Sequence, residues 1–456
     1  MSLSIIILAA GQGTRMKSSL PKVLHKLAGR TLLEHVYVSA LQLNFREAHI
    51  VYGYGGKLVP ETLSHLQAVN WVEQGKQLGT GHAVQQAIAN IPLVDDVLIL
   101  YGDVPFITFQ TLQRLVNAAK DSGFSLLTAY IDEPRGYGRI IRNDKGRILR
   151  IVEERDADEK ELLVNEINTG MMVVNARNLS RWLQELDNDN SQGEFYLTDI
   201  VQKAVAEGVR IKTTNPDSVS EIHGVNDRVQ LAEMERYYQL VQAHHLMRQG
   251  VTLLDPGRFD LRGDLEAGQD ITIDVNVVLE GSISIGNDVT IGANCLIKDA
   301  DIADGVTILP NCVIENAVIG KRCRIGPFSR IRPRTRLAED VHVGNFVEVK
   351  NSEVARGSKM NHLSYIGDTD IGTDSNIGAG TITCNYDGAN KHRTVIGNDV
   401  HIGSDTQLIA PVKIGNSVTI GAGTTVTRDV EPNRLIHNKI EHREVKGWQR
   451  PKKKQD

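Results

Sequence analysis

The segment Ile396–Gly403, which reads I-G-N-D-V-H-I-G, begins and ends with an aliphatic residue followed by glycine, six positions apart. The same spacing returns between Ile271 and Val430, in the pairs Ile285-Gly286 and Ile291-Gly292, Ile319-Gly320 and Ile325-Gly326, Ile371-Gly372 and Ile377-Gly378, and Ile414-Gly415 and Ile420-Gly421. Such a repeat is typical of a short strand and a turn, in which one aliphatic side chain fills the axis and glycine permits the bend. Because no coil can bury its own apolar face, neighbouring coils must stack. The stretch therefore predicts a solenoid.

An all-β sandwich is the alternative for a stretch of short strands. It requires alternation with period two and turns about every eight to twelve residues, and this pattern is missing from residues 271–430. The six-residue pattern resembles that of the hexapeptide-repeat acyltransferases. This resemblance implies a left-handed parallel β-helix that assembles as a homotrimer.

The length and charge of the chain limit its class. A chain of 456 residues is too long for one ordinary core, so we expect two sizeable domains. The net charge of −5 gives no electrostatic reason to expect nucleic-acid binding, and only the tail around Arg450–Lys454 is markedly basic.

Cysteine usage and hydropathy indicate the compartment. The four cysteines all fall in the solenoid stretch and form no C-x-x-C pair, which favours reduced thiols in a cytoplasm. Ile5–Leu8 is apolar, but a glycine-rich loop rather than a signal-peptide cleavage site follows it. No apolar run approaches the length that spans a membrane, so we expect no membrane insertion.

From residue 4 to about 215, short β-branched runs alternate with helical patterns. The runs and patterns are Ile5–Leu8, Leu32–Leu43, His49–Tyr52, Gly81–Ile91, Val97–Leu100, Thr111–Ala119 and Leu126–Ile131. This alternation predicts an α/β domain with a Rossmann-like, mainly parallel sheet covered by helices. Ligands of such sheets bind beyond the carboxyl ends of the strands.

A glycine-rich loop stands at the first such end. It reads L-A-A-G-Q-G-T-R-M over Leu8–Met16 and is followed by Leu20-Pro21-Lys22. Glycines let backbone N–H groups approach a polyphosphate, while Arg15 and Lys22 supply positive charge against its oxygens. By spacing alone a plain strand-to-helix turn is the alternative, since the loop matches neither G-x-G-x-x-G nor the P-loop.

The full string resembles the signature of the sugar-phosphate nucleotidyltransferases and matches it at every fixed position. Further matches follow in family order at Gln74, Leu78–Gly81, Tyr101–Asp103, Gly136–Arg139, Glu153, Asn168–Gly170 and Gly224–Asn226. The resemblance implies catalytic roles for Arg15 and Lys22. It also implies a binding set for UTP and the UDP-sugar product: Leu8, Ala9, Ala10, Gly11, Lys22, Gln74, Gly79, Thr80, Tyr101, Gly102, Asp103, Gly138, Glu153, Asn168 and Asn226.

Asp103 follows the aliphatic strand Val97–Leu100, which puts a carboxylate at the sheet edge where phosphates should lie. Mg²⁺ prefers hard oxygen ligands and usually takes only one or two from protein. With the resemblance, Asp103 and Asn226 are the expected Mg²⁺ ligands. Taken alone, an aspartate after a strand is more often a helix cap.

The stretch from Asp227 to Arg248 contains no glycine or proline and has apolar residues at helical spacing, and Gly250 ends it. It predicts a long helix that joins two architectures. We therefore expect a nucleotidyltransferase domain over residues 1–226, a helical linker over 227–250, and a hexapeptide-repeat domain with a C-terminal tail over 251–456.

The six-residue spacing fails in two places. Ile377 and Ile396 are nineteen residues apart rather than eighteen, and the polar stretch Cys384–Lys391 between them predicts a protruding loop. Upstream, Lys359–Tyr365 lacks an aliphatic residue at the expected interval. It contains His362, which could be the base that deprotonates an amine attacking a thioester, since histidine titrates near neutral pH. Glu348 could orient it or charge it. Any single histidine of fourteen is more often structural.

Three motifs strengthen the interpretation of His362 as a base: His362–Asp368, Asn376–Thr381 and Asn385–Gly388. With the N-terminal signature, they make nearly the whole chain resemble the bacterial bifunctional enzymes that combine a glucosamine-1-phosphate acetyltransferase with an N-acetylglucosamine-1-phosphate uridylyltransferase. The resemblance implies His362 as base. It places around the sugar phosphate Arg332, Glu348, Lys350, Tyr365, Asn376, Asn385, Tyr386 and Lys391, and it lines the acetyl-CoA groove with Ala379, Ser404, Ala422 and Lys439.

Two positions depart from that family's pattern. Asn361 stands where glycine is common, and Lys439 stands where an arginine contacts coenzyme A. A lysine is a point charge rather than a planar fork, so we expect the phosphate contact to survive with weaker geometry.

The resemblance implies a cytoplasmic enzyme that makes UDP-N-acetylglucosamine in two steps. Acetyl-CoA acetylates glucosamine-1-phosphate, and UTP then reacts with N-acetylglucosamine-1-phosphate to release pyrophosphate. One alternative is a nucleotidyltransferase whose solenoid only regulates or oligomerises, but the solenoids of such relatives are short. A second, a non-catalytic scaffold, is disfavoured by the presence of Arg15, Lys22, Asp103 and Asn226.

Overall fold

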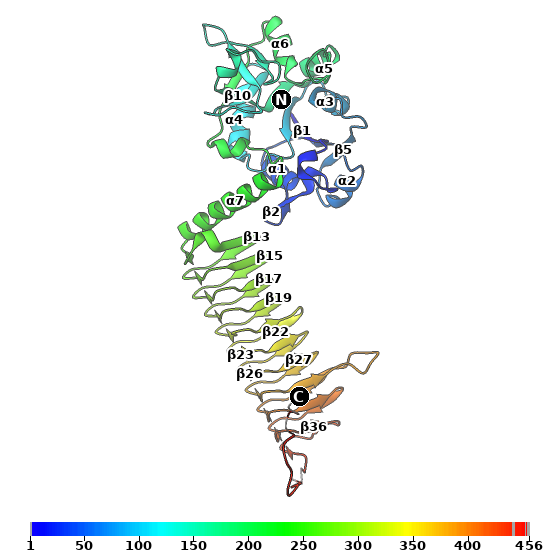
Figure 1. Cartoon of the computed structure of the whole chain (residues 1–456), viewed down its shortest axis with the longest axis vertical. Coiled ribbons are helices and arrows are strands. Elements are labelled where there is room, and N and C mark those ends of the chain that lie inside the picture. Colours follow the sequence, from blue (N-terminus) through cyan, green and yellow to red (C-terminus); the bar gives the residue numbers. More distant parts are fainter. Residues whose placement is uncertain (1, 440–442, 452, 454–456) are drawn as a thin grey trace. The chain divides into compact units, whose positions relative to one another are not determined.

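The computed structural model describes residues 2–439, 443–451 and 453, and it divides into two compact units, residues 1–236 and 237–456. Each unit is described by itself. Figure 1 shows the first as a sheet with helices packed on it and the second as a stack of short strands. The predicted long helix is present as α7, Arg228–Arg248, whose first turns belong to the first unit.

The first unit contains the predicted α/β sheet. Its strands are β1 (Leu3–Ala9), β2 (Lys26–Leu27), β3 (Arg30–Thr31), β4 (Ala48–Tyr52), β5 (Val69–Glu73), β6 (Asp96–Tyr101), β7 (Phe124–Tyr130), β8 (Arg139–Arg142), β9 (Ile148–Val152), β10 (Glu166–Asn175) and β11 (Lys212–Thr214). Its helices are η1 (Thr14–Met16), η2 (Lys22–Leu24), α1 (Leu32–Leu41), α2 (Leu58–Thr62), α3 (Thr80–Ile88), α4 (Phe109–Ala119), η3 (Glu161–Leu163), α5 (Ala176–Gln184), α6 (Asp199–Ala206) and η4 (Val219–Ile222).

The main sheet has the order β11-β7-β10-β6-β1-β4-β5 and is mostly parallel, with β10 antiparallel to both of its neighbours. Strand β1 is buried on both faces: Ile5 and Ile7 pack into one apolar cluster, and Ile6 and Leu8 pack into the other. Burial on both faces explains why its sequence is continuously aliphatic rather than alternating. The expectation of a mainly parallel, helix-covered sheet is confirmed.

The second unit is the predicted solenoid. One sheet contains β12 (Thr252–Leu253), β14 (Thr272–Ile273), β16 (Thr290–Ile291), β18 (Thr307–Ile308), β20 (Arg324–Ile325), β23 (His342–Asn345), β26 (Lys359–His362), β29 (Asn376–Ile377), β32 (His401–Ile402), β35 (Thr419–Ile420) and β37 (Leu435–Ile436). The other contains β13 (Phe259–Ala267), β15 (Val277–Ile285), β17 (Leu296–Ile302), β19 (Val313–Ile319), β21 (Arg330–Ile331), β22 (Thr335–Leu337), β24 (Glu348–Lys350), β25 (Glu353–Val354), β27 (Tyr365–Gly367), β28 (Thr369–Ile371), β30 (Ile382–Cys384), β31 (Thr394–Ile396), β33 (Gln407–Ile409), β34 (Val412–Ile414) and β36 (Thr425–Val426).

Successive coils stack in parallel and bury one aliphatic ladder. The inward residues of the first sheet are Ile273, Ile291, Ile308, Ile325, Val343, Met360, Ile377, Ile402 and Ile420. Met360 and Ile366 are both fully buried and six residues apart. The sequence interpretation of Lys359–Tyr365 as a break in the pattern was therefore wrong, because a methionine serves as the inward residue.

The corners between strands need a left-handed backbone. At one corner the successive residues with positive φ are Asn276, Asn294, Asn311, Phe328, Phe346 and Leu363. Asparagine adopts this conformation at low cost, but bulky side chains do so rarely. Phe328, Phe346 and Leu363 are moreover at least half exposed, and the two phenylalanine rings stack with centroids 5.4 Å apart. An exposed apolar column is thus held on a strained corner.

The predicted loop leaves the solenoid between β30 and β31, where Figure 1 shows it as an orange projection. A bridge between Tyr386 and Lys391 closes it. Asp387 orders its tip by accepting from the backbone N–H groups of Ala389 and Asn390 and from His392 Nε2. Hydrogen bonds from the Asn390 backbone and His392 hold the pKa of Asp387 well below its usual range. The loop therefore has a defined conformation of its own.

The inward ladder is expected to carry the stability of the solenoid. Replacement of the buried Ile291 by alanine should lower the free energy of unfolding by about 2–5 kcal/mol, because a cavity replaces stacked methyl groups. The neighbouring exposed Thr290 is the control, and Thr290→Ala should change stability by less than about 0.5 kcal/mol. Urea unfolding followed by circular dichroism measures both, and equal effects of the two substitutions would contradict the stacking argument.

Candidate active sites

The first site forms where β1 and β6 end side by side. These strands are parallel neighbours with Leu8 opposite Tyr101, and the Gly102 N–H donates to the Leu8 carbonyl at 2.9 Å. Their shared edge brings the glycine-rich loop after β1 next to Asp103 after β6. This is the carboxyl edge at which the sequence predicted ligand binding.

Two cavities open at this edge and share Thr14, Tyr101 and Asp103. One, of about 480 Å³, is lined by Leu8, Ala9, Ala10, Gly11, Gln12, Thr14, Lys22, Val23, Gln74, Gln77, Gly79, Thr80, Ala83, Tyr101, Asp103 and Glu194. The other, of about 990 Å³, is lined by Thr14, Arg15, Tyr101, Asp103, Val104, Arg135, Gly136, Tyr137, Glu153, Glu154, Arg155, Thr169, Gln192, Ile222, His223, Gly224, Asn226, Gln230, Glu233 and Met234. The smaller cavity thus holds most of the residues predicted to bind nucleotide.

Charged and amide groups converge between the two cavities. The Lys22 ammonium donates to Asp103 Oδ2 and, at 3.3 Å, to Asn226 Oδ1. Arg15 Nη2 donates to the same amide oxygen at 2.9 Å. Lys22 and Asp103 are mostly buried, with side-chain exposures of 14% and 19%. Side chains more than two hundred residues apart in the sequence therefore meet at one point.

Tyr101 separates the cavities and stays neutral. Burial raises the pKa of its phenol, and the nearby carboxylates of Glu153 and Asp103 raise this pKa further. A Cβ atom at Gly170 would lie 2.4 Å from the Tyr101 ring, so only glycine at this position leaves enough space for the ring. Burial also raises the pKa of Glu153. A hydrogen bond of 3.0 Å from the Thr198 hydroxyl acts in the opposite direction but does not cancel this shift.

Three predicted residues line neither cavity. Gly102 is buried between the strand ends, where an added Cβ would crowd Leu33 and the Leu8 carbonyl. Gly138 accepts a backbone hydrogen bond from Asn168 at 2.8 Å. Asn168 is buried and accepts from the Gly170 N–H through its side chain. These residues support the cavity wall behind the groups that line it.

Sequence reasoning missed several groups in this unit. Arg228, the first residue of α7, donates from Nε to the Met16 carbonyl at 3.3 Å and lies 3.5 Å from His25 Nδ1. A hydrogen bond of 3.1 Å from Arg155 Nη1 to Gln192 Oε1 joins two loops beside the larger cavity. Arg228 lay in a stretch interpreted only as linker, and the two loops carry no motif, so no sequence signal pointed to them.

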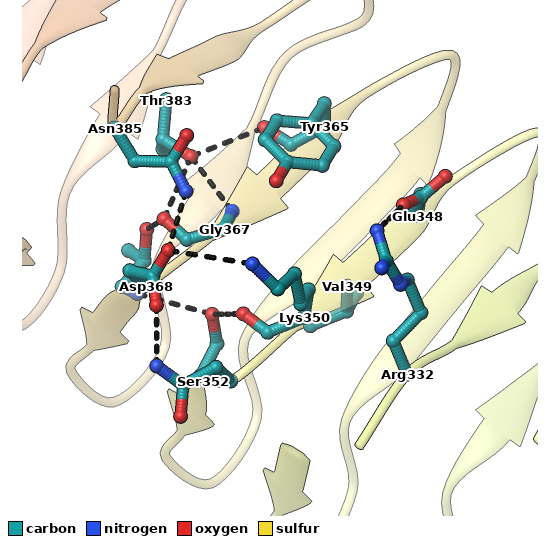
Figure 2. Close-up of polar contacts among 12 residues, drawn as sticks. Arg332, Glu348, Val349, Lys350, Ser352, Tyr365, Gly367, Asp368, Thr383 and Asn385 are labelled. Carbon is teal, nitrogen blue, oxygen red and sulfur yellow. Dashed lines mark hydrogen bonds and ion pairs between the residues drawn. The ribbon is translucent and has the colours of Figure 1, made fainter. Parts of the chain in front are cut away.

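The second site lies on adjacent strands of the solenoid. Glu348 on β24 is paired in register with Arg330 on β21 and Tyr365 on β27. Arg332 Nη1 donates to Glu348 Oε1 at 2.7 Å. Figure 2 shows Arg332, Glu348, Lys350, Tyr365 and Asn385 around a common region. The structure therefore brings these five predicted residues together.

A glycine makes this packing possible. A Cβ atom at Gly367 would lie 2.5 Å from the Tyr365 hydroxyl and 2.7 Å from Asn385 Nδ2. The Gly367 N–H donates to Thr383 Oγ1 at 2.7 Å, which fixes the strand that carries it. The adjacent Lys391 ammonium and partial burial lower the pKa of Lys350, while the Asp368 carboxylate opposes them.

His362 stands at the end of β26 and is exposed. Its Nδ1 lies 2.7 Å from Asn345 Oδ1, an acceptor, so Nδ1 carries the proton and Nε2 is left as the basic nitrogen. No described hydrogen bond joins Glu348 to this ring. Glu348 accepts from Arg332 instead, and the partner of His362 is Asn345, the residue opposite it in register on β23.

Three of the residues expected to line the acetyl-CoA groove form a column with His362. Asn345, His362, Ala379, Ser404 and Ala422 each precede the residue that turns one corner of its coil. Backbone hydrogen bonds link the column from Asp405 N–H to the Ala379 carbonyl and from Gly423 N–H to the Ser404 carbonyl.

The remaining predicted residues lie apart from the cluster. Asn376 is on β29, next to His401 in register. The Tyr386 hydroxyl donates to Gly388 within the protruding loop, at 2.6 Å. Lys439 is exposed beyond β37, next to Asn438, whose amide donates to the Gly423 carbonyl. No described contact joins the side chain of Asn376 or Tyr386 to the five clustered residues.

The described residues contain no group of three or more His, Cys, Asp and Glu side chains that could hold a metal ion. Among their helices, none is both long and apolar enough to cross a membrane.

Comparison with known proteins identifies the family. Residues 5–199 match the MobA-like NTP transferase domain, residues 262–354 the GMPPB C-terminal domain, and residues 393–428 the bacterial transferase hexapeptide of six repeats. The bifunctional protein GlmU of Methylococcus capsulatus is 57% identical over 454 residues, which cover 99% of this chain and 98% of that protein. The chain belongs to the GlmU family of bifunctional proteins. It is accordingly an enzyme with a nucleotidyltransferase half and an acyltransferase half.

Two solved structures resemble parts of the chain more distantly. A UDP-glucose pyrophosphorylase complexed with UDP-glucose is 17% identical, with a TM-score of 0.44, over 52% of this chain and 98% of its own. A nucleotidyl transferase from Methanothermobacter is 19% identical, with a TM-score of 0.38, over 55% of this chain and 99% of its own. The family assignment rests on the GlmU relative and not on these structures.

Proposed function

We propose that the two sites divide between them the synthesis of UDP-N-acetylglucosamine, the activity of this family. One observation supports this division most directly. Each half has its own cluster of cations beside hydrogen-bonding side chains, Arg15 and Lys22 in the first unit and Arg332 and Lys350 in the second. Each cluster can bind a phosphate, and the side chains beside the two clusters suit two different reactions.

In the solenoid, acetyl-CoA and glucosamine-1-phosphate are the substrates. The amine nitrogen attacks the thioester carbonyl, His362 Nε2 accepts the proton, and the thiolate of coenzyme A leaves as the amide forms. The hydrogen bond between His362 Nδ1 and Asn345 supports this role, because it keeps Nε2 free of its own proton. Arg332, Lys350 and Lys391 supply charge for the sugar phosphate, and the column Ala379, Ser404 and Ala422 offers small residues along which coenzyme A can lie.

In the first unit, UTP and N-acetylglucosamine-1-phosphate are the substrates. A phosphate oxygen of the sugar attacks the α-phosphorus of UTP, and the bond to pyrophosphate breaks. Arg15 and Lys22 stabilise the negative charge that moves onto the departing pyrophosphate. The smaller cavity suits the nucleotide and the larger one the sugar, with Asp103 and Tyr101 lining both.

Asp103 and Asn226 fit a Mg²⁺ ion. Their side-chain oxygens both contact one cation, the Lys22 ammonium, and so already converge on a point. A site of two protein oxygens is ordinary for Mg²⁺, which takes its remaining ligands from phosphate and water. Mg²⁺ held there would supply positive charge against the phosphate oxygens.

We further propose a homotrimer in which neighbouring chains complete the acetyl-transfer site. A single solenoid gives His362 an exposed position on a corner. The exposed column of Phe328, Phe346 and Leu363 runs along the same corner and is unusually apolar for a free surface. A second copy of the chain packed on this column would bury it and close a groove beside His362.

The two activities are expected to separate by mutation. Asp103→Ala should abolish uridylyl transfer and leave acetyl transfer unchanged. His362→Ala should do the reverse and lower the acetyl-transfer rate by about 10²–10⁴-fold, the usual contribution of a general base. Assays of each half-reaction on the same preparations measure this. A His362→Ala protein with normal acetyl transfer would refute the assignment of the base.

Removal of divalent metal should also separate the activities. EDTA is expected to stop uridylyl transfer, because the positive charge that Mg²⁺ would supply against the phosphate oxygens would be lost, and to leave thiol release from acetyl-CoA unchanged. EDTA saturated with Mg²⁺ beforehand is the matched control. Equal inhibition of both half-reactions by metal-free EDTA would show that the acetyl-transfer site also needs metal.

Dissociation should abolish acetyl transfer first. Phe328→Asp should weaken the trimer by placing a charge in its interface, and aspartate tolerates the left-handed φ of 54° at this position. Leu254→Asp is the control, because Leu254 is 59% exposed and lies outside the column. Light scattering over a dilution series, with both assays, measures the effect. A monomer with full acetyl-transfer activity would leave the shared groove without support.

A further inference from the structure

We propose that Asp368 is a positioning residue of the acetyl-transfer site, which holds Lys350 and Asn385 in place to receive the phosphate of the amino sugar. The inference rests on the proposed function of the solenoid site. Sequence reasoning quoted Asp368 as part of a motif but gave it no role.

Asp368 occupies the centre of the cluster. Its Oδ2 accepts from Asn385 Nδ2 and lies 3.9 Å from the Lys350 ammonium, and its Oδ1 accepts from Asn351 Nδ2. Figure 2 shows the carboxylate between Asn385 and Lys350. One buried group therefore touches side chains from two parts of the site that are separated by 35 positions in the sequence.

The carboxylate is built into the fold rather than free to move. Asp368 is 8% exposed, and its backbone has a φ of 52° at a corner of the coil. Its N–H donates to the Lys350 carbonyl at 2.9 Å, and its carbonyl accepts from the Thr394 N–H. Thr394 is where the chain returns from the protruding loop, so the corner is fixed on both sides.

Electrostatics explain why an acid is needed here. The charged or titratable groups around Lys350 are Lys391 from the loop, Arg332 just after β21, Glu348 on the same strand as Lys350, Tyr365 on the neighbouring β27, and Asp368. Arg332 is already paired with Glu348, whereas Lys350 and Lys391 repel each other. Burial would raise the pKa of Asp368, but hydrogen bonds from Asn351 and Asn385 and the charge of Lys350 outweigh it and lower this pKa. An ionised Asp368 therefore opposes the lowering of the Lys350 pKa and favours the charged ammonium group of Lys350.

The side chain does not need to contact substrate to act. Lys350 and Asn385 are the groups expected at the sugar phosphate, and Asp368 lies behind them. Its loss should misplace two ligands of the phosphate and leave the coenzyme A column, which starts at His362 on another sheet, unaffected. This predicts an effect specific to one of the two substrates.

The test is Asp368→Asn in the full-length protein. Asparagine has the same shape and tolerates a positive φ, so the coil should fold. The KM for glucosamine-1-phosphate should rise by about tenfold or more, the usual effect of losing a hydrogen bond to a charged group. The KM for acetyl-CoA should stay within about twofold, and uridylyl transfer should not change. Asp370→Asn is the matched control, since Asp370 lies on β28 and pairs with the exposed Arg393.

A pH profile separates positioning from a general loss of structure. Without the Asp368 charge, Lys391 and burial act on Lys350 unopposed, so its pKa falls further and it loses its proton at lower pH. The alkaline limb of kcat/KM for glucosamine-1-phosphate should then move to lower pH in Asp368→Asn, but not in Asp370→Asn. An unchanged limb, or equal rises in KM for both substrates, would overturn the proposal.

Lys350→Met distinguishes failure of this inference from failure of the proposed site. If Lys350→Met leaves the KM for glucosamine-1-phosphate unchanged, the proposed phosphate site is itself wrong. If Lys350→Met raises this KM and Asp368→Asn does not, only the role of Asp368 is refuted. Added to Lys350→Met, Asp368→Asn should raise KM less than it does alone, because one of the two groups it positions is already gone.

Discussion

The burial of one aliphatic side chain against the next, coil after coil, is the interaction on which the solenoid depends. No coil is stable alone, and the ladder from Ile273 to Ile420 runs through the whole unit without losing its inward position. Parallel neighbours are held at the spacing of a β-sheet, about 4.8 Å. Residues at equivalent places in successive coils therefore form straight columns. The alignment of His362 with Ala379, Ser404 and Ala422 is a consequence of this packing.

The two sites solve the same physical problem in similar ways. Each contains a lysine that the proposed function places against a phosphate, and in each an aspartate just after a strand lies against that lysine: Asp103 against Lys22 and Asp368 against Lys350. An amide oxygen or amide N–H completes each group, from Asn226 in one case and Asn385 in the other. A long, flexible side chain that is already held in place loses less conformational entropy when the ligand binds.

The sequence predicted the elements that repeat or alternate and missed contacts that depend on the fold. Periodicity was enough for the solenoid, and the extra residue between Ile377 and Ile396 was enough for the protruding loop. The inward role of Met360 was missed because the pattern was sought among aliphatic residues only. The pairing of His362 with Asn345 and the central position of Asp368 arise from the stacking of coils, which places side chains seventeen residues apart in contact. No local motif encodes such contacts.

The first turns of α7 hold the segment that carries Lys22 in place, although the helix looks like a connector. Arg228 donates to the Met16 carbonyl, and Glu235 accepts from the Ala28 N–H at 2.7 Å, so both ends of the segment that carries Lys22 are fastened to this helix. The consequence concerns how such a chain can be recombined. A chimera that keeps this nucleotidyltransferase half and replaces the C-terminal half must be joined after Arg236, because an earlier junction would remove part of the support of the segment that carries Lys22.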